Sequence, residues 1–173
     1  MVDLQPHLEG DLVLLRPLRA EDYQALFAVA SDVSIWEQHP TKDRYTPAGF
    51  LPFFEESLNA SGAMVIVDAT SGEIIGSSRF KMIDEAEKIV EIGWTFLAKK
   101  YWGGRYNRAI KKLMVNHILE KGGTVVLYVD KTNIRSQRAV LKIGGRPMLD
   151  TDFKYHHAMP SNLTYIVTEI IRD

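Results

Sequence analysis

The sequence predicts a mixed α/β fold, with one central sheet of six to seven strands and helices on both of its faces. Strand-like and helix-like stretches alternate along the 173 residues, and a content of 46% hydrophobic and 25% charged residues is that of a globular protein. In the second half, a strand, a Gly-rich basic loop, a helix and another strand follow one another. That order is typical of a βαβ unit with two parallel strands. We expect a single domain over residues 1–173.

The first elements are expected to be a strand, a helix and a polar loop. The stretch 12–18 is predicted as a strand. Residues 20–31 carry apolar side chains at helical spacing and two acids, Glu21 and Asp22, in the first turn, where the helix dipole favours negative charge. The polar stretch 32–45 is expected to be a loop.

A second helix is expected over 46–58, with Thr46 as N-cap and Pro47 at the first helical position. Pro52 fits this helix only within its first turns, because proline lacks a backbone N–H. The later elements follow from strand propensity, turns and helical spacing. They are a hairpin of strands 64–67 and 73–81, a strand over 89–97, a helix from Tyr106 to the Gly122–Gly123 pair, a buried strand over 124–129, a helix over 133–143 and a last strand over 163–171.

Composition excludes several classes of protein. The chain has no cysteine, which excludes disulfides, thiolate metal sites and a cysteine nucleophile. The N-terminal stretch lacks the basic and apolar regions of a secretory signal, and no apolar run approaches the ~20 residues needed to cross a membrane. We therefore expect a cytoplasmic protein without a membrane partner.

Positive charge is concentrated in one block, residues 98–146. The block holds twelve Lys and Arg and two acids, so it carries +10 and the rest of the chain −11, within a net charge of −1. A local positive field attracts a compact polyanion, whereas the nearly neutral total argues against a general nucleic-acid binder. A pair of solvated, lysine-rich helix faces is the alternative explanation.

The Gly-rich loop at 100–105 joins the strand 89–97 to the next helix. Unpaired N–H groups and the dipole at a helix start bind anions, most often phosphate. Gly103 and Gly104 allow the backbone to approach such a ligand closely. The chain has neither G-x-x-x-x-G-K-[ST] nor G-x-G-x-x-G, which disfavours nucleotide hydrolysis and dinucleotide binding.

Three motifs point to one family. The loop reads Lys100-x-x-Gly103-x-Arg105, and Asn133-Ile-Arg-Ser136 precedes a helix that ends in Lys142-Ile-Gly144. The third motif is the opening phrase Leu14-Leu-Arg-Pro-Leu-Arg-Ala-Glu-Asp22. Together with the order of elements, they resemble the GNAT family of N-acetyltransferases, and within it the ribosomal-protein N-terminal-alanine acetyltransferase branch. The resemblance implies the GNAT fold, in which the fourth and fifth strands, 89–97 and 124–129, are parallel and splay apart.

The resemblance also implies a reaction, in which the acetyl group of acetyl-CoA passes directly to a primary amine on a protein N-terminus or a small molecule, without a metal. The pyrophosphate would rest on backbone N–H groups of 102–107, and the pantetheine arm would pair with backbone of 94–97. Coenzyme A carries about four negative charges, which suits the basic block. The implied donor-binding residues are Trp94, Thr95, Phe96, Leu97, Trp102, Gly103, Gly104, Arg105, Tyr106, Asn107, Asn133 and Arg138.

Two positions depart from the family pattern. Arg105 stands where the family usually has Gly or Ala, and Val140 stands where many members carry a tyrosine that acts as general acid. The resemblance leaves Ser136 as the hydroxyl that protonates the departing thiolate.

Glu91 is the candidate general base. An ammonium with a pKa of ~10.4 must lose a proton before it can attack a thioester. On a regular strand, Glu91 shares a face with Gly93 and Thr95. A carboxylate between small residues indicates a cleft, while larger side chains fill the other face: Val90, Ile92, Trp94 and Phe96. The alternative is a solvent-facing acid paired with Arg79 or Lys81 on the neighbouring strand.

The acceptor side is defined only by family analogy. Loop 32–45 would wall the acceptor site, with Trp36, Glu37 and His39 as candidate substrate-binding residues, although loop polarity and apolar packing also explain them. His156 and His157 would lie on the same side. By the same analogy, a homodimer through the C-terminal strands is expected. Three other functions stay open: a non-catalytic acyl-CoA-binding module, the same fold using another acyl-CoA, and nucleic-acid binding through the basic block.

Overall fold

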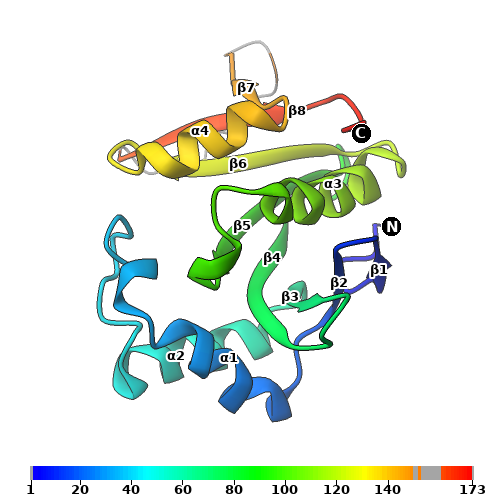
Figure 1. The fold of residues 1–173 in the computed structure, drawn as a ribbon. Coiled ribbons are helices and arrows are strands. Elements are labelled where there is room, and N and C mark those ends of the chain that lie inside the picture. Colours follow the sequence, from blue (N-terminus) through cyan, green and yellow to red (C-terminus); the bar gives the residue numbers. More distant parts are fainter. Residues whose placement is uncertain (1, 150–151, 153–160, 173) are drawn as a thin grey trace.

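The computed structural model describes residues 2–149, 152 and 161–172, and these build a sheet of eight strands (Figure 1). The sheet has the order β1-β2-β3-β4-β5-β6-β8-β7. Six to seven strands were expected, and the difference comes from β1 and β7, which at two residues each are too short to show alternation. The strands are β1 (Leu8–Glu9), β2 (Val13–Pro17), β3 (Ala63–Asp68), β4 (Ile74–Asp84), β5 (Ile89–Leu97), β6 (Thr124–Asp130), β7 (Arg146–Pro147) and β8 (Asn162–Val167).

The four expected helices are present, with shifted ends. In α2 the Thr46 hydroxyl accepts the N–H of Gly49, which confirms the predicted N-cap. Pro52 is the sixth residue of this helix, deeper than expected. The helices are α1 (Tyr23–Ala30), α2 (Pro47–Asn59), α3 (Arg105–Leu119) and α4 (Ile134–Lys142), and the short 3-10 turns are η1 (Ala20–Asp22), η2 (Val33–Ile35) and η3 (Lys99–Tyr101).

Helices cover both faces of the sheet, as predicted. On one face, α3 and α4 bury an aliphatic core, in which Ile110 and Met114 meet Ile92 and Leu127. On the other face, α1 and α2 enclose an aromatic cluster. Its rings contact one another, mostly tilted or edge to face, at centroid separations of 5.1–6.4 Å. They belong to Tyr23, Phe27, Trp36, Phe50, Phe53, Phe54 and Phe96. The same two-layer arrangement of helices is visible in Figure 1.

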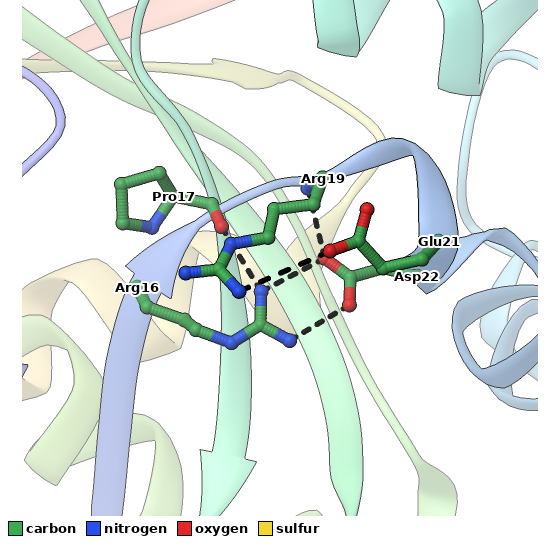
Figure 2. A network of polar contacts seen from close by, with 5 residues as sticks. All are labelled: Arg16, Pro17, Arg19, Glu21 and Asp22. Atoms are coloured by element: carbon green, nitrogen blue, oxygen red, sulfur yellow. Dashed lines mark hydrogen bonds and ion pairs between the residues drawn. The ribbon is translucent and has the colours of Figure 1, made fainter.

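A bidentate ion pair fixes the start of α1 to the end of β2 (Figure 2). Arg16 donates from Nη1 to Asp22 Oδ2 at 2.9 Å and from Nη2 to Oδ1 at 2.7 Å, and the backbone N–H of Arg19 donates to Oδ2 at 2.8 Å. Burial alone would raise the pKa of Asp22, but these hydrogen bonds and the two arginine charges together lower it. Asp22 therefore acts as the anchor of the β2–α1 turn rather than as a dipole partner of the helix.

We expect Asp22→Asn to lower the free energy of unfolding by about 1–3 kcal/mol, because it leaves a charged guanidinium facing a neutral amide in a site where Asp22 is only 4% exposed. A carboxylate with a lowered folded-state pKa stabilises the fold above its ordinary pKa, and this contribution is lost as the pH falls through the folded-state value. Urea titrations at neutral and acid pH should thus show the two proteins converging in acid. Glu21→Gln, at a 70% exposed side chain, is the control and should change stability by less than ~0.5 kcal/mol.

Candidate active site

The two parallel strands of the sheet separate in the middle of the molecule. β5 pairs with β6 only over Ile89–Glu91 and Thr124–Val126, although β5 continues to Leu97 and β6 to Asp130. On their outer edges both strands stay paired, β5 with β4 and β6 with β8. The splay that was predicted for the strands 89–97 and 124–129 is confirmed, and it leaves β5 without a partner strand on this edge after Glu91. The region between the two diverging strands is called the gap below.

A β-bulge lies in the unpaired part of β5. Opposite β4, Arg79 pairs with Gly93 and Ser77 with Phe96, so β5 has one extra residue in this interval. Trp94 has a φ of +51°, a left-handed conformation that is uncommon for a large side chain. Beyond the bulge, each side chain of β5 points to the face opposite to the one expected for a regular strand.

The bulge corrects the predicted faces of β5. Thr95 points to the α3 side, where its hydroxyl accepts a hydrogen bond from Lys111. Phe96 joins the aromatic cluster of α1 and α2, and the guanidinium of Arg79 lies 4.5 Å from the Trp94 ring centroid on that same side. Glu91 thus shares its face with Gly93 but not with Thr95. The prediction assumed a regular strand, and a single inserted residue exchanges the faces of all that follow it.

Glu91 is buried, with 8% of its surface exposed, and points to the α2 side of the sheet. A Cβ added to Gly93 would lie 3.1 Å from Glu91 Oε1, so the glycine leaves room beside the carboxylate. Lys81 lies opposite Glu91 in the register, and Arg79 instead pairs with Glu56 at 2.8 Å. Among the described residues the carboxylate has no hydrogen-bond partner. Burial raises the pKa of Glu91, and the charges of Lys81 and Arg79 offset part of that effect.

Tyr128 is a site residue that the sequence analysis missed. It lies on β6, two residues after Val126, which is the register partner of Glu91, so both side chains are on the same face at the gap. Its hydroxyl is buried and has no hydrogen-bond partner among the described residues. Burial raises the pKa of Tyr128, and the negative charge of Glu91 raises it further. The one sequence feature that indicated Tyr128 is the predicted parallel pairing of the strands 89–97 and 124–129.

The Gly-rich loop and the start of α3 form the second part of the site. Gly103 has a φ of +70° with open space around its Cα, and Gly104 is the N-cap of α3 without a side-chain cap. The first N–H groups of α3 therefore point outward without an intrahelical partner. Trp102 Nε1 donates to Leu97 O at 2.7 Å, and Tyr106 Oη donates to Asp68 Oδ1 at 2.8 Å. These two bonds fix the loop to the ends of β5 and β3.

The remaining donor-side candidates lie around this loop. Arg105 and Arg138 are exposed, so the Arg105 side chain extends into solvent and does not fill the loop. Asn107 is half-buried in the first turn of α3. Asn133 is the N-cap of α4, where its Oδ1 accepts the N–H of Ser136 at 3.1 Å. This capping bond gives Asn133 a structural role in addition to the predicted one, and it places Ser136 in the first turn of α4.

The acceptor-side candidates are in different environments. Trp36 is 2% exposed and donates from Nε1 to Ala30 O at 2.7 Å, so its ring belongs to the aromatic cluster. Glu37 is exposed. His39 is half-buried, with Nδ1 at Thr41 and Nε2 3.4 Å from Arg44; burial and the Arg44 charge lower its pKa. His156 and His157 lie outside the described residues.

Arg135, another residue missed from the sequence, connects the two sides. Its guanidinium lies 4.0 Å from the ring centroid of Trp102, which belongs to the Gly-rich loop. Its Nη2 also donates to Ile35 O at 3.3 Å, in the loop that follows α1. A side chain of α4 therefore contacts both the Gly-rich loop and the segment that follows α1.

A cavity of about 920 Å³ lies elsewhere, between α1 and the strands at the β1 edge. Its lining includes Lys99 and Lys100 but no residue of β5 or β6. Among the described residues no helix is long and apolar enough to cross a membrane. The same part of the chain holds no group of three or more His, Asp or Glu side chains arranged for a metal.

Solved structures share this fold at low sequence identity. A GCN5-related N-acetyltransferase from Brucella melitensis is 20% identical, with a TM-score of 0.79 over 94% of this chain and 78% of that one. A GNAT-family acetyltransferase from Bacillus anthracis is 16% identical, with a TM-score of 0.74 over 94% and 98%. A Vibrio cholerae protein assigned as a ribosomal-protein-serine acetyltransferase is 11% identical, with a TM-score of 0.68 over 96% and 99%.

Family membership rests on the sequence itself. No curated protein sequence gives a significant match. The family described as the acetyltransferase (GNAT) domain matches residues 13–146, which is most of the chain and includes β5, the Gly-rich loop, α3 and β6. The chain therefore belongs to the GNAT family of acetyltransferases.

Proposed function

We propose that this protein is an N-acetyltransferase that moves the acetyl group of acetyl-CoA directly to a primary amine, on a protein N-terminus or a small molecule. The observation that carries the proposal is the joint presence of an uncapped helix start and an unpaired strand edge on either side of Trp102. The first supplies N–H groups for a pyrophosphate. The second supplies backbone partners for an extended, amide-containing arm.

The donor would bind along this edge. Gly103, Gly104 and the first residues of α3 (Arg105, Tyr106 and Asn107) hold the phosphates, with the exposed Arg105 and Arg138 as flanking cations. The stretch from Trp94 to Leu97 faces the arm, since β5 has no partner on that edge. Asn133, at the start of α4, borders the gap from the β6 side.

Glu91 is proposed as the base. Burial raises the pKa of Glu91, which makes the carboxylate a stronger proton acceptor than an ordinary glutamate. Relay through a water, with Tyr128 beside it, would carry the proton from the incoming ammonium to the carboxylate. The amine then attacks the thioester carbonyl, and Ser136 is the first candidate to protonate the departing thiolate. Trp36, Glu37 and His39 stay proposed acceptor-side residues, and the ribosomal-protein branch and a homodimer remain proposals as well.

We expect the protein to release free thiol from acetyl-CoA when a suitable primary amine is present, and Glu91→Gln to lower kcat about 10²-fold. Glutamine removes an unpaired buried charge, so this variant should keep or raise the melting temperature. The wild-type rate should rise with pH as Glu91 loses its proton, and this rise should occur at a higher pH than the ordinary pKa of a glutamate.

An amine panel with a thiol-reactive dye provides the measurement. Glu87→Gln, in the exposed turn after β4, is the matched control and should behave as wild type. CoA binding without thiol release on any amine would favour a non-catalytic module. A Glu91→Gln variant with an undiminished rate would remove Glu91 as base.

We expect Arg105→Glu to raise the dissociation constant for CoA about tenfold or more, because it places a negative charge at the helix start proposed for the pyrophosphate. Lys121→Glu makes the same change of charge just beyond the other end of α3. That position is about 24 Å away along the helix, beyond the ~10 Å Debye length at 0.1 M salt. Calorimetric titration should show weakened binding only for Arg105→Glu, and equal Kd values for the two variants would contradict the site.

A further inference from the structure

Lys111 is a buried lysine for which the proposed reaction has so far given no role. It lies on α3 with 7% of its surface exposed, inside the aliphatic core between the helix and the sheet. Its neighbours on the helix, Ile110, Met114 and Val115, are fully buried. Its Nζ donates to Thr95 Oγ1 at 2.7 Å, and no carboxylate of the described residues forms an ion pair with it. A buried ammonium without a counter-ion is costly and is retained for a reason other than stability.

Thr95 connects this amine to the gap between β5 and β6. Its hydroxyl oxygen is 2.7 Å from Ser78 Oγ as well as from Lys111, and Ser78 Oγ also lies 3.3 Å from Gly93 O. A hydroxyl has two acceptor sites and one proton. When Lys111 and Ser78 both donate to Thr95, the proton of Thr95 is left for Gly93 O, 3.4 Å away, or for a ligand atom that approaches more closely. Thr95 is half-exposed. It lies directly after the bulge, in the part of β5 that has no partner strand on the side of β6.

The bulge places this pair on the opposite side of β5 from Glu91. Glu91 and Gly93 face α2, whereas Thr95 faces α3. The amine adds to the carbonyl carbon before the thiolate is expelled from the tetrahedral intermediate. The base and the acid therefore act on different atoms, the nitrogen and the sulfur, and groups on opposite sides of β5 can serve them separately.

We propose that Lys111 supplies, through the hydroxyl of Thr95, the proton taken up by the thiolate that leaves acetyl-CoA. This inference rests on the proposed acetyl transfer. In the step, a C–N bond forms between the amine and the carbonyl carbon, and the C–S bond breaks with its electron pair on sulfur. Thr95 gives its proton to the sulfur and receives one from Lys111, while Glu91 holds the proton removed from the amine. Exchange with water after product release restores both groups.

The surroundings of Lys111 suit an acid that works near neutral pH. Burial lowers the pKa of Lys111 to about 7. Charged side chains of the adjacent strands, Arg79, Lys81 and Glu91, face the other side of the sheet. Among the described residues, the titratable groups on the α3 side include Tyr101, Tyr106, His117, Tyr165 and Asp68, of which Tyr106 and Asp68 bond each other and His117 bonds Asp3 O.

Lys111 is a stronger acid than the alternative, Ser136. A serine hydroxyl ionises only far above neutral pH unless a neighbour activates it. The contact found at Ser136 is made by its backbone N–H to Asn133. Lys111 acts through Thr95 and is therefore a positioning and proton-supplying residue rather than one that touches the thioester.

The test compares kcat of wild type and Lys111→Met across pH with one saturating amine. We expect the wild type to be about 10²-fold faster near pH 6, and the ratio of the two rates to approach one near pH 9, as Lys111 loses its proton in the wild type. Groups common to both proteins cancel in this ratio. A merely structural role gives a ratio that does not change with pH, and that result would overturn the proposal.

Further variants separate the remaining outcomes. Thr95→Val breaks the relay while keeping the size and shape of the side chain and should reproduce the same pH-dependent ratio, while Thr95→Ser should restore most of the rate. Lys121→Met is the control for loss of a lysine charge and should leave kcat unchanged. A pH-dependent loss in Ser136→Ala with none in Lys111→Met would transfer the role to Ser136. Wild-type protein without thiol release on any amine would refute acetyl transfer itself, whereas active wild type and equally active Lys111→Met would refute only the role of Lys111.

Discussion

The separation of β5 from β6 after Glu91 is the constraint on which the rest of the site depends. Each strand keeps a complete partner on its outer edge, β4 for β5 and β8 for β6, so the gap can open without leaving either strand isolated. Backbone groups at such an inner edge still need partners. Trp102 satisfies the last carbonyl of β5, that of Leu97, and the remaining edge is free to receive an extended ligand. The donor loop and the gap are thus one continuous surface.

The bulge at Trp94 determines which side chains reach that surface from each side. A left-handed residue with a large side chain costs about 1–3 kcal/mol, and the packing around it offsets this cost. Arg79 stacks on the Trp94 ring, and Phe96 fills the aromatic cluster under α1 and α2. Without the extra residue, Thr95 would lie on the side of Glu91, and Lys111 would lose its hydrogen bond to the Thr95 hydroxyl. The bulge therefore places the Glu91 carboxylate, whose pKa is raised, and the buried amine of Lys111 on opposite sides of β5.

The sequence predicted the elements well because their signals are local. Helical spacing, the Thr46 cap and the strand–loop–helix–strand order each depend on a few neighbouring residues, and all were found. What failed was long-range. Strict alternation was extended through β5 although nothing in Glu91–Leu97 marks the bulge, which arises from the register with β4. Lys111 sits between apolar helix positions and was counted as surface charge, and Tyr128 gained meaning only once β6 was placed beside Glu91. The two-residue strands depend wholly on their partners.

The net charge of the basic block, residues 98–146, overstates how many of its cations are available to an anion. A total of +10 over residues 98–146 treats every cation as available to an anion. In the structure Lys111 lies in the core, Arg108 donates to the carbonyls of Lys142 and Arg172, and Arg146 pairs with Asp152 at 2.6 Å. Of these three, Arg108 holds α3 to the end of α4 and to the C-terminal segment. The proposed binding of a compact polyanion then rests less on the total than on the helix start after Gly103 and Gly104, where the first N–H groups of α3 lack intrahelical partners. A salt-sensitive, diffuse attraction over the whole block would suit a nucleic acid, whereas a single helix start with unpaired N–H groups would suit the proposed pyrophosphate.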